Sequence, residues 1–243
     1  MLIRGVADAV FPPACFGCRA AILGAAQHWC DACLQMWLAA TGRAYCPTCG
    51  RGVGPYEVID RRCGRCSGER FAHDGLVRVA GYEPFVRSLV RQYKFAGQQR
   101  LDRPLGECIA AAIESAPWRG AIEALVPVPS HWTVRWQRGF FSTGALTAQA
   151  ARVLGLESLP LLVRPKRGRS QIGLPQTERC KNVRGNFHLA RGANVEGRTL
   201  CVIDDVMVTG ATLNENVRVL KQAGAKAVHV AIIAKVDSTA TDV

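Results

Sequence analysis

The sequence has no hydrophobic run long enough to cross a bilayer, and acidic and aromatic residues are both scarce. Its longest apolar runs, such as residues 227–234, fall far short of the roughly 20 residues that a membrane-spanning helix needs. The opening segment, MLIRGVADAVFPP, lacks the apolar length and the small-residue cleavage site of a secretory signal. We therefore expect a cytoplasmic protein without a membrane span.

The shortage of acids leaves a strong positive charge that is unevenly spread. The chain has 31 Lys and Arg against 19 Asp and Glu, a net charge of +12, and residues 161–198 alone hold nine basic and two acidic side chains. Such a stretch suits a polyanion, either nucleic acid or a ligand with several phosphates. The alternative is a solvated basic surface that keeps the protein in solution. With 49% apolar and 21% charged residues, disorder throughout the chain is excluded.

Eight of the 11 cysteines form four pairs with the same two-residue gap. The pairs are Cys15 and Cys18, Cys30 and Cys33, Cys46 and Cys49, and Cys63 and Cys66. Because no export signal is evident, metal binding is a better interpretation than disulfides. This gap lets both sulfurs of a pair reach one ion, and two pairs complete a tetrahedral shell around zinc. The sequence therefore predicts two zinc ions.

The pairing of the cysteines is open at the level of sequence. The simplest arrangement is sequential, with the first two pairs on one ion and the last two on the other; the first pair could also join the third. Either way, four thiolates leave no position for water or substrate, so both sites would be structural. Between the first two sites, residues 31–42 predict a helix with Leu34, Trp37 and Leu38 on one face. With so little core of its own, this region should fold only when metal binds.

After the cysteines, strand and helix patterns alternate. The expected strands are 76–82, 124–128, 158–163, 199–204 and 227–233, and the expected helices are 84–95, 101–115, 142–154 and 211–223. The Arg- and Gly-rich residues 164–185 have no periodicity and predict a loop. Such alternation indicates an α/β fold, with a parallel sheet covered by helices on both faces and ligands at the carboxyl ends of its strands.

The most informative segment is the turn between the fourth strand and the last helix. The strand ends at Asp204 and Asp205, and residues 208–212 then open the helix. Backbone amides at a helix N-terminus hold phosphate, and Gly210 allows the backbone to approach it closely. Two carboxylates beside a phosphate would repel it, so they should reach past it to the hydroxyls of a sugar. A metal ion would relieve the remaining repulsion between the acids and a diphosphate.

This segment, residues 202–213, resembles the phosphoribosyl diphosphate binding motif of the type I phosphoribosyltransferases. In that family the acidic pair contacts the ribose 2′ and 3′ hydroxyls, and the loop wraps the 5′-phosphate. The resemblance implies that Asp204 and Asp205 contact the ribose. It implies that the 5′-phosphate is bound by Val208, Thr209, Gly210, Ala211 and Thr212. Val208 departs from the family, which usually has Thr there, so a backbone donor remains while one hydroxyl is lost.

Nearly the whole chain resembles the ComF family of competence-associated proteins. The resemblance is carried by the four cysteine pairs and by residues 93–97 (YKFAG), 126–129 (VPVP), 138–140 (RGF), Gln171, Arg179, Asn182, Gly185 and Phe187. It implies a double zinc-ribbon domain over residues 1–70 and a type I phosphoribosyltransferase-like domain over 71–243. Where the family commonly follows RGF with Asn-Gln, this chain has Phe141 and Ser142.

Further site residues follow from charge. Loss of diphosphate from the sugar builds negative charge on the leaving group, so catalysis needs cations and donors there. Pro129 and Ser130 follow a strand and are expected to contact the diphosphate. Lys94 and Arg138 are the candidate catalytic cations, together with the two acids; surface charge is the alternative for both. The basic residues Arg164, Lys166, Arg167 and Arg169 would close over the diphosphate or hold nucleic acid.

Two functions are compatible with this pattern. In the first, the protein binds phosphoribosyl diphosphate with magnesium and transfers the phosphoribosyl group to an acceptor that the sequence does not identify. In the second, it is a non-catalytic competence factor that binds single-stranded DNA through the zinc ribbons and the basic loop. The resemblance implies a part in DNA uptake or utilisation, linked to nucleotide metabolism and to other competence proteins.

Overall fold

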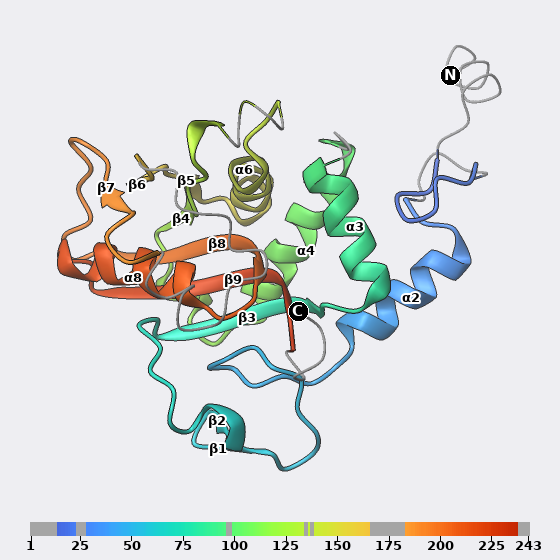
Figure 1. Ribbon diagram of the computed structural model, residues 1–243, viewed down its shortest axis with the longest axis horizontal. Helices are drawn as coiled ribbons and strands as arrows, with labels where there is room; N and C mark the ends of the chain where they lie inside the picture. The colour runs from blue at the N-terminus through green and yellow to red at the C-terminus, as the bar shows by residue number, and fades with distance from the viewer. Residues whose placement is uncertain are drawn as a thin grey trace.

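A parallel five-stranded sheet forms the centre of the chain (Figure 1). The computed structural model describes residues 14–22, 28–95, 99–133, 136, 139–165 and 183–237. The strands are β3 (Gly75–Gly81), β4 (Ala124–Pro127), β5 (Glu157–Ser158), β8 (Thr199–Met207) and β9 (Ala227–Lys235), in the order β3-β9-β8-β4-β5. Every neighbouring pair is parallel. The predicted α/β class is therefore confirmed, with β8 in the middle of the sheet.

Helices cover both faces of the sheet. They are α3 (Pro84–Phe95), α4 (Asp102–Glu114), α6 (Ser142–Leu154) and α8 (Ala211–Gln222). The side chains of α3, α4 and α6 share one apolar core with alternate residues of the strands, and α8 packs into a second core on the opposite face. Both faces are therefore dry, which is why the strands are almost wholly apolar. No helix within the described ranges is long and apolar enough to cross a membrane.

The prediction of one strand over 158–163 is wrong, because two short strands replace it. β5 joins the main sheet, whereas β6 (Leu162–Val163) pairs with the antiparallel β7 (His188–Leu189) outside it. Pro160 lies between them and has no N–H to offer a strand ladder. The chain therefore leaves the sheet at this point.

The helix predicted between the first two cysteine sites is confirmed as α2 (Asp31–Thr41), but of its predicted apolar face only Trp37 is buried. Leu34 and Leu38 are 37% and 51% exposed, while Cys33, Trp37 and Ala40 are buried. The buried positions are spaced by four and three residues, as one helix face requires. Trp37 stacks on Trp29, with 5.5 Å between ring centroids, and joins the main core.

The cysteine-rich segment covers the outer strand of the sheet. The amide of Leu76 on β3 donates to the carbonyl of Pro47 at 3.2 Å, and Arg78 Nη1 donates to the carbonyl of Gly50 at 2.7 Å. All residues of β3 are buried as a result. An open edge strand would expose unpaired backbone groups. The short elements of this segment are β1 (Val58–Ile59), β2 (Arg62–Cys63) and the 3₁₀ turn η1 (Gly64–Cys66).

Some predictions fall outside the described residues. Arg138 lies there, and so do residues 166–182, which make up most of the loop predicted over 164–185. Two further 3₁₀ turns, η2 (Gln99–Leu101) and η3 (Arg119–Ala121), flank α4. The domain boundary after residue 70 stays a prediction.

Candidate functional site

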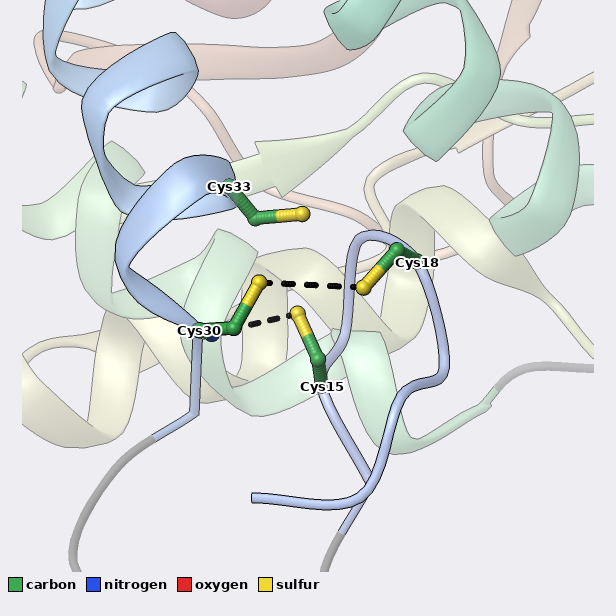
Figure 2. Close-up of side chains that lie close together, drawn as sticks. All are labelled: Cys15, Cys18, Cys30 and Cys33. Carbon is green, nitrogen blue, oxygen red and sulfur yellow. Dashed lines mark hydrogen bonds between the residues drawn. The ribbon is translucent and has the colours of Figure 1, made fainter.

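The cysteines form two clusters, paired in the order of the sequence. Cys15, Cys18, Cys30 and Cys33 make the first, and Cys46, Cys49, Cys63 and Cys66 make the second; within each, the ligand atoms lie within 4.8 Å of one another. Figure 2 shows the first cluster, in which Cys33 comes from the first turn of α2 and the other three come from the loops before it. The interleaved pairing left open by the sequence is not the one adopted.

The sulfur separations fit zinc. In the first cluster, 3.7 Å separates the sulfurs of Cys18 and Cys30, and in the second 3.6 Å separates those of Cys49 and Cys63. Four sulfurs held tetrahedrally at 2.3 Å from zinc are about 3.8 Å apart, whereas disulfide sulfurs are about 2 Å apart. Both clusters therefore have the donors and spacing of structural zinc sites.

Backbone amides favour the thiolate form that zinc requires. Burial disfavours the charge on Cys15, but hydrogen bonds from the backbone of Cys30, Cys18 and Gly17 outweigh it and lower the pKa of Cys15 to about 6. The same balance lowers the pKa of Cys46 to about 7. Each cluster thus contains a thiol that is ready to lose its proton near neutral pH.

In the part of the chain that forms the parallel sheet and its helices, an ion pair joins α3 to β8. Lys94 Nζ lies 2.7 Å from Asp205 Oδ1, and both side chains are largely buried, at 19% and 8% exposed. The sequence placed both acids at the end of their strand, but β8 continues through them to Met207, which pairs with Lys235 on β9. A cation and an acid that are 111 positions apart in the sequence are brought together here.

The second acid has an unusual proton affinity. Burial and the negative charge of Asp205 raise the pKa of Asp204 to about 8, although Lys94 acts in the opposite direction. Arg164 also lies near enough for the charge of Asp204 to act on it, and its guanidinium carbon lies 5.3 Å from the centroid of the Phe187 ring. Asp204 therefore lies between buried cations and a like charge, in a setting that would favour a bound cation or hydroxyl group.

The loop after β8 is open at the helix N-terminus. Gly210 has φ +81°, and a Cβ there would lie 2.6 Å from Met207 Cε. Within the described residues, the amides of Thr209, Gly210 and Thr212 have no hydrogen-bond acceptor. Val208 is 37% exposed and residues 209, 211 and 212 are partly exposed, whereas Gly210 is buried. Unpaired amides at the start of a helix are the donors with which proteins bind phosphate.

The other predicted contacts are partly placed. The amide of Val128 donates to the carbonyl of Ile203 at 2.9 Å, which brings the end of β4 beside β8. Pro129 and Ser130, which follow directly, therefore leave the sheet at the same edge as Asp204. Pro129 is buried and Ser130 is partly exposed.

Two polar residues that the sequence reasoning missed tie this loop and the helix after it to other parts of the chain. Lys235 Nζ donates to the carbonyl of Val208 at 2.7 Å. The side chain of Asn214, in the first turn of α8, bonds the backbone of Arg70 and Ala72. Lys235 ends an apolar strand next to the strand that carries the acids, and this position was a signal that could have revealed it. Asn214 lies within a helix, where an asparagine gives no such signal.

Comparison with known proteins identifies two segments of the chain. A family model of the double zinc ribbon domain matches residues 6–67, and a model of the phosphoribosyl transferase domain matches residues 149–243. The chain joins a double zinc ribbon to a phosphoribosyltransferase domain. The second match contains β8, the acids and the loop.

Curated relatives match this chain over most of its length. "Competence protein F" of Haemophilus influenzae is 29% identical over 221 residues, which are 89% of this chain and 94% of that protein. "DNA utilization protein YhgH" of Escherichia coli K12 is 28% identical over 225 residues, 90% of this chain and 95% of that protein. The resemblance to the ComF family is confirmed by this domain pair and these relatives.

Similarity to solved structures covers part of the chain. A glutamine phosphoribosylpyrophosphate amidotransferase from B. subtilis is 22% identical, with a TM-score of 0.40 over 58% of this chain and 30% of that chain.

Proposed function

We propose that this chain binds phosphoribosyl diphosphate with magnesium and transfers its phosphoribosyl group, in a cytoplasmic process of DNA uptake or utilisation that involves other competence proteins. One observation carries the proposal: Asp205, largely buried and paired with Lys94 of α3 at 2.7 Å, lies on the strand that leads directly into the loop of residues 208–212. The names of the two relatives support the link to competence and DNA utilisation.

Each group has a distinct part in this proposal. The amides of Thr209, Gly210 and Thr212 hold the 5′-phosphate, and the carboxylates of Asp204 and Asp205 accept hydrogen bonds from the ribose hydroxyls. The bond between ribose C1 and the diphosphate oxygen breaks, and the oxygen keeps the electron pair. An acceptor with a lone pair forms the new bond to C1 and loses a proton. Lys94, with Arg138 as the second candidate, balances charge on the departing diphosphate.

The residues present fit magnesium of the kind that accompanies a diphosphate. Mg²⁺ is usually held by one or two carboxylates together with substrate phosphates rather than by a full protein cage. Asp204 and Asp205 provide those carboxylates, and the pKa of Asp204, raised to about 8, indicates a site where added positive charge is favourable. The ion would supply charge neutralisation at the diphosphate; the chain's own residues position the sugar.

Calorimetric titration with phosphoribosyl diphosphate and magnesium tests the proposal. Wild type is expected to bind, and Asp205→Asn to lose at least about tenfold in affinity, because a charge-assisted hydrogen bond is worth 1.5–3 kcal/mol. Glu107→Gln is the matched control, since this acid on α4 is partly exposed and pairs with Arg103 within the same helix. Equal affinity in all three proteins would refute the assignment of the site.

A purely DNA-binding protein would behave differently. It would tolerate Asp205→Asn and lose affinity for single-stranded DNA when Arg164, Lys166, Arg167 and Arg169 are changed to Ala. Its binding would also weaken steeply with salt through counterion release. Loss of diphosphate release in Asp205→Asn, with DNA affinity unchanged, supports the transferase.

A further inference from the structure

The second cysteine cluster lies against the residue that holds the phosphate loop. Its turn after Cys49 passes through Gly50, at φ +72°. A Cβ on Gly50 would lie 3.2 Å from Leu76 Cδ2 and 3.5 Å from Lys235 Cβ. The backbone of the turn therefore packs directly on the stem of Lys235, and the zinc-bound turn limits where that stem can lie.

Lys235 in turn fixes the direction of a peptide group in the loop. Its side chain is buried, at 2% exposed for the residue, and Nζ donates to the carbonyls of Val208 and Val236 at 2.7 Å and 2.5 Å. In a trans peptide the carbonyl and the following N–H point in opposite directions. Holding the Val208 carbonyl toward Lys235 therefore turns the amide of Thr209 away from it, as a donor to the phosphate requires.

A second connection leads from the same cluster to the start of α8. Four residues after Cys66, the carbonyl of Arg70 accepts from Asn214 Nδ2 at 3.4 Å, and the amide of Ala72 donates to Asn214 Oδ1 at 3.0 Å. Between them, Phe71 packs against the second cluster, and its ring lies 3.8 Å from where a Gly210 Cβ would be. The chain leaving the second zinc site is thus tied to the first turn of the phosphate-binding helix.

We infer that the second zinc site, Cys46, Cys49, Cys63 and Cys66, positions the phosphate loop through Lys235 and Asn214, so that zinc and phosphoribosyl diphosphate bind this chain cooperatively. The inference rests on the proposed function. Lys235 and Asn214 are positioning residues, because they act through the loop backbone. Linkage is reciprocal: if zinc orders the loop for its ligand, the ligand tightens the zinc.

The first zinc site provides an internal comparison. Its Gly17 turn contacts Phe85, and the carbonyl of Gly17 accepts from Gln92 Nε2 at 3.2 Å, both on α3. The contacts of this site thus lead to α3, which carries Lys94 in its last turn, and not to the backbone of residues 208–212. Ligand bound in the loop should therefore protect the second zinc more than the first.

The test measures zinc release from the intact protein by a chromogenic zinc chelator, with and without phosphoribosyl diphosphate and magnesium. Release is expected in two phases, and Cys18→Ser, which disables the first site, identifies the phase of the second. The ligand should slow that phase by about fivefold or more, at the lower end of typical allosteric coupling. Both phases slowing equally, or neither slowing, overturns the inference.

Lys235→Met shows whether the coupling passes through this residue. The variant should keep two zinc ions yet lose the effect of the ligand on the second phase, and its affinity for phosphoribosyl diphosphate should fall. Lys235→Arg, which retains a donor, should restore part of the coupling. Lys221→Met is the matched control, since Lys221 pairs with Asp74 at the surface of α8. Normal coupling in Lys235→Met would contradict the proposed route.

Failure of this inference differs from failure of the proposed function. If calorimetry shows no binding of phosphoribosyl diphosphate to wild type, the proposed function is wrong. If the ligand binds and zinc release does not respond, the proposed function stands and the coupling is wrong. A titration of the same sample with inorganic diphosphate separates an effect of the 5′-phosphate from one of the leaving group.

Discussion

The ammonium of Lys94 lies 2.7 Å from the carboxylate of Asp205, in a setting from which most solvent is excluded. The lysine lies in the last turn of α3, and the acid lies in the central strand of the sheet. Neither charge would be stable there alone, because an unpaired buried ion costs several kcal/mol. The pair thus keeps a charged acid near the carboxyl ends of the strands, where a ligand is expected.

Removing one partner of this pair should be worse for stability than removing both. Lys94→Met leaves Asp205 unpaired and is expected to lower the free energy of unfolding by about 3 kcal/mol. Lys94→Met/Asp205→Asn should recover part of that loss, while binding of phosphoribosyl diphosphate is impaired in both proteins. Urea denaturation and calorimetry measure the two effects. Additive losses of stability in the double variant would show that the pair is not energetically coupled.

Gly210 should tolerate no side chain. Gly210→Ala combines a left-handed backbone, which costs a residue with a Cβ about 1–2 kcal/mol, with a clash against Met207. We expect lower stability and a larger loss of affinity for phosphoribosyl diphosphate, because the amides of the loop are displaced. Gly120→Ala is the control, since a Cβ there meets nothing within 4 Å. If both variants bind equally well, the loop does not hold the phosphate.

The sequence predicted what depends on local order and missed what depends on distant contacts. The CxxC spacing is a local feature, and it predicted both cysteine clusters. The periodicity of α3 and α8 predicted their ends to within a residue or so. In contrast, the exposure of Leu34 is decided by where α2 packs, and the break after β5 by Pro160 and by the pairing of β6 with β7.

The candidate site divides in the same way. Asp204, Asp205 and the loop form one continuous segment, so sequence reasoning could group them. Their partners come from elsewhere in the chain: Lys94 was predicted as a cation but without its partner, and Lys235 was not predicted at all. Such pairs depend on the order of the strands, which puts β9 beside β8, and a single sequence does not specify that order.

Purified protein should contain about two zinc ions per chain, and each should depend on its own cysteines. Cys66→Ser, in the second cluster, is expected to hold about one zinc and to be less stable, because structural zinc contributes directly to folding. Cys108→Ser should keep both, since Cys108 lies in α4 and belongs to neither cluster. Elemental analysis measures the content. Full zinc content in Cys66→Ser would contradict the ligand assignment.

Stability should fall as the pH drops from about 6.5 to 4, partly because of His73. Burial lowers the pKa of His73 to about 4, and within the described residues neither ring nitrogen has a hydrogen-bond partner. Since the folded state binds this proton more weakly than the unfolded state does, protonation of His73 favours unfolding. The free energy of unfolding is therefore unaffected by this group above pH 6.5 and falls progressively as the pH drops toward 4. The cost between pH 7 and pH 5 is about 2 kcal/mol.

His73→Phe tests this effect, because a phenyl ring fills similar space and takes up no proton. Its unfolding free energy should depend less on pH than that of wild type, although some dependence remains because burial also lowers the pKa of His229. Urea denaturation at pH 7 and pH 5, with saturating zinc in every sample, measures the difference. Parallel curves for the two proteins would mean that His73 is not the group responsible.

A crystal structure with phosphoribosyl diphosphate and magnesium would show directly which groups hold the ligand. We expect the 5′-phosphate within hydrogen-bond distance of the amides of Thr209, Gly210 and Thr212, and the ribose hydroxyls on Asp204 and Asp205. A phosphate bound elsewhere, with these amides still open to solvent, would contradict this expectation.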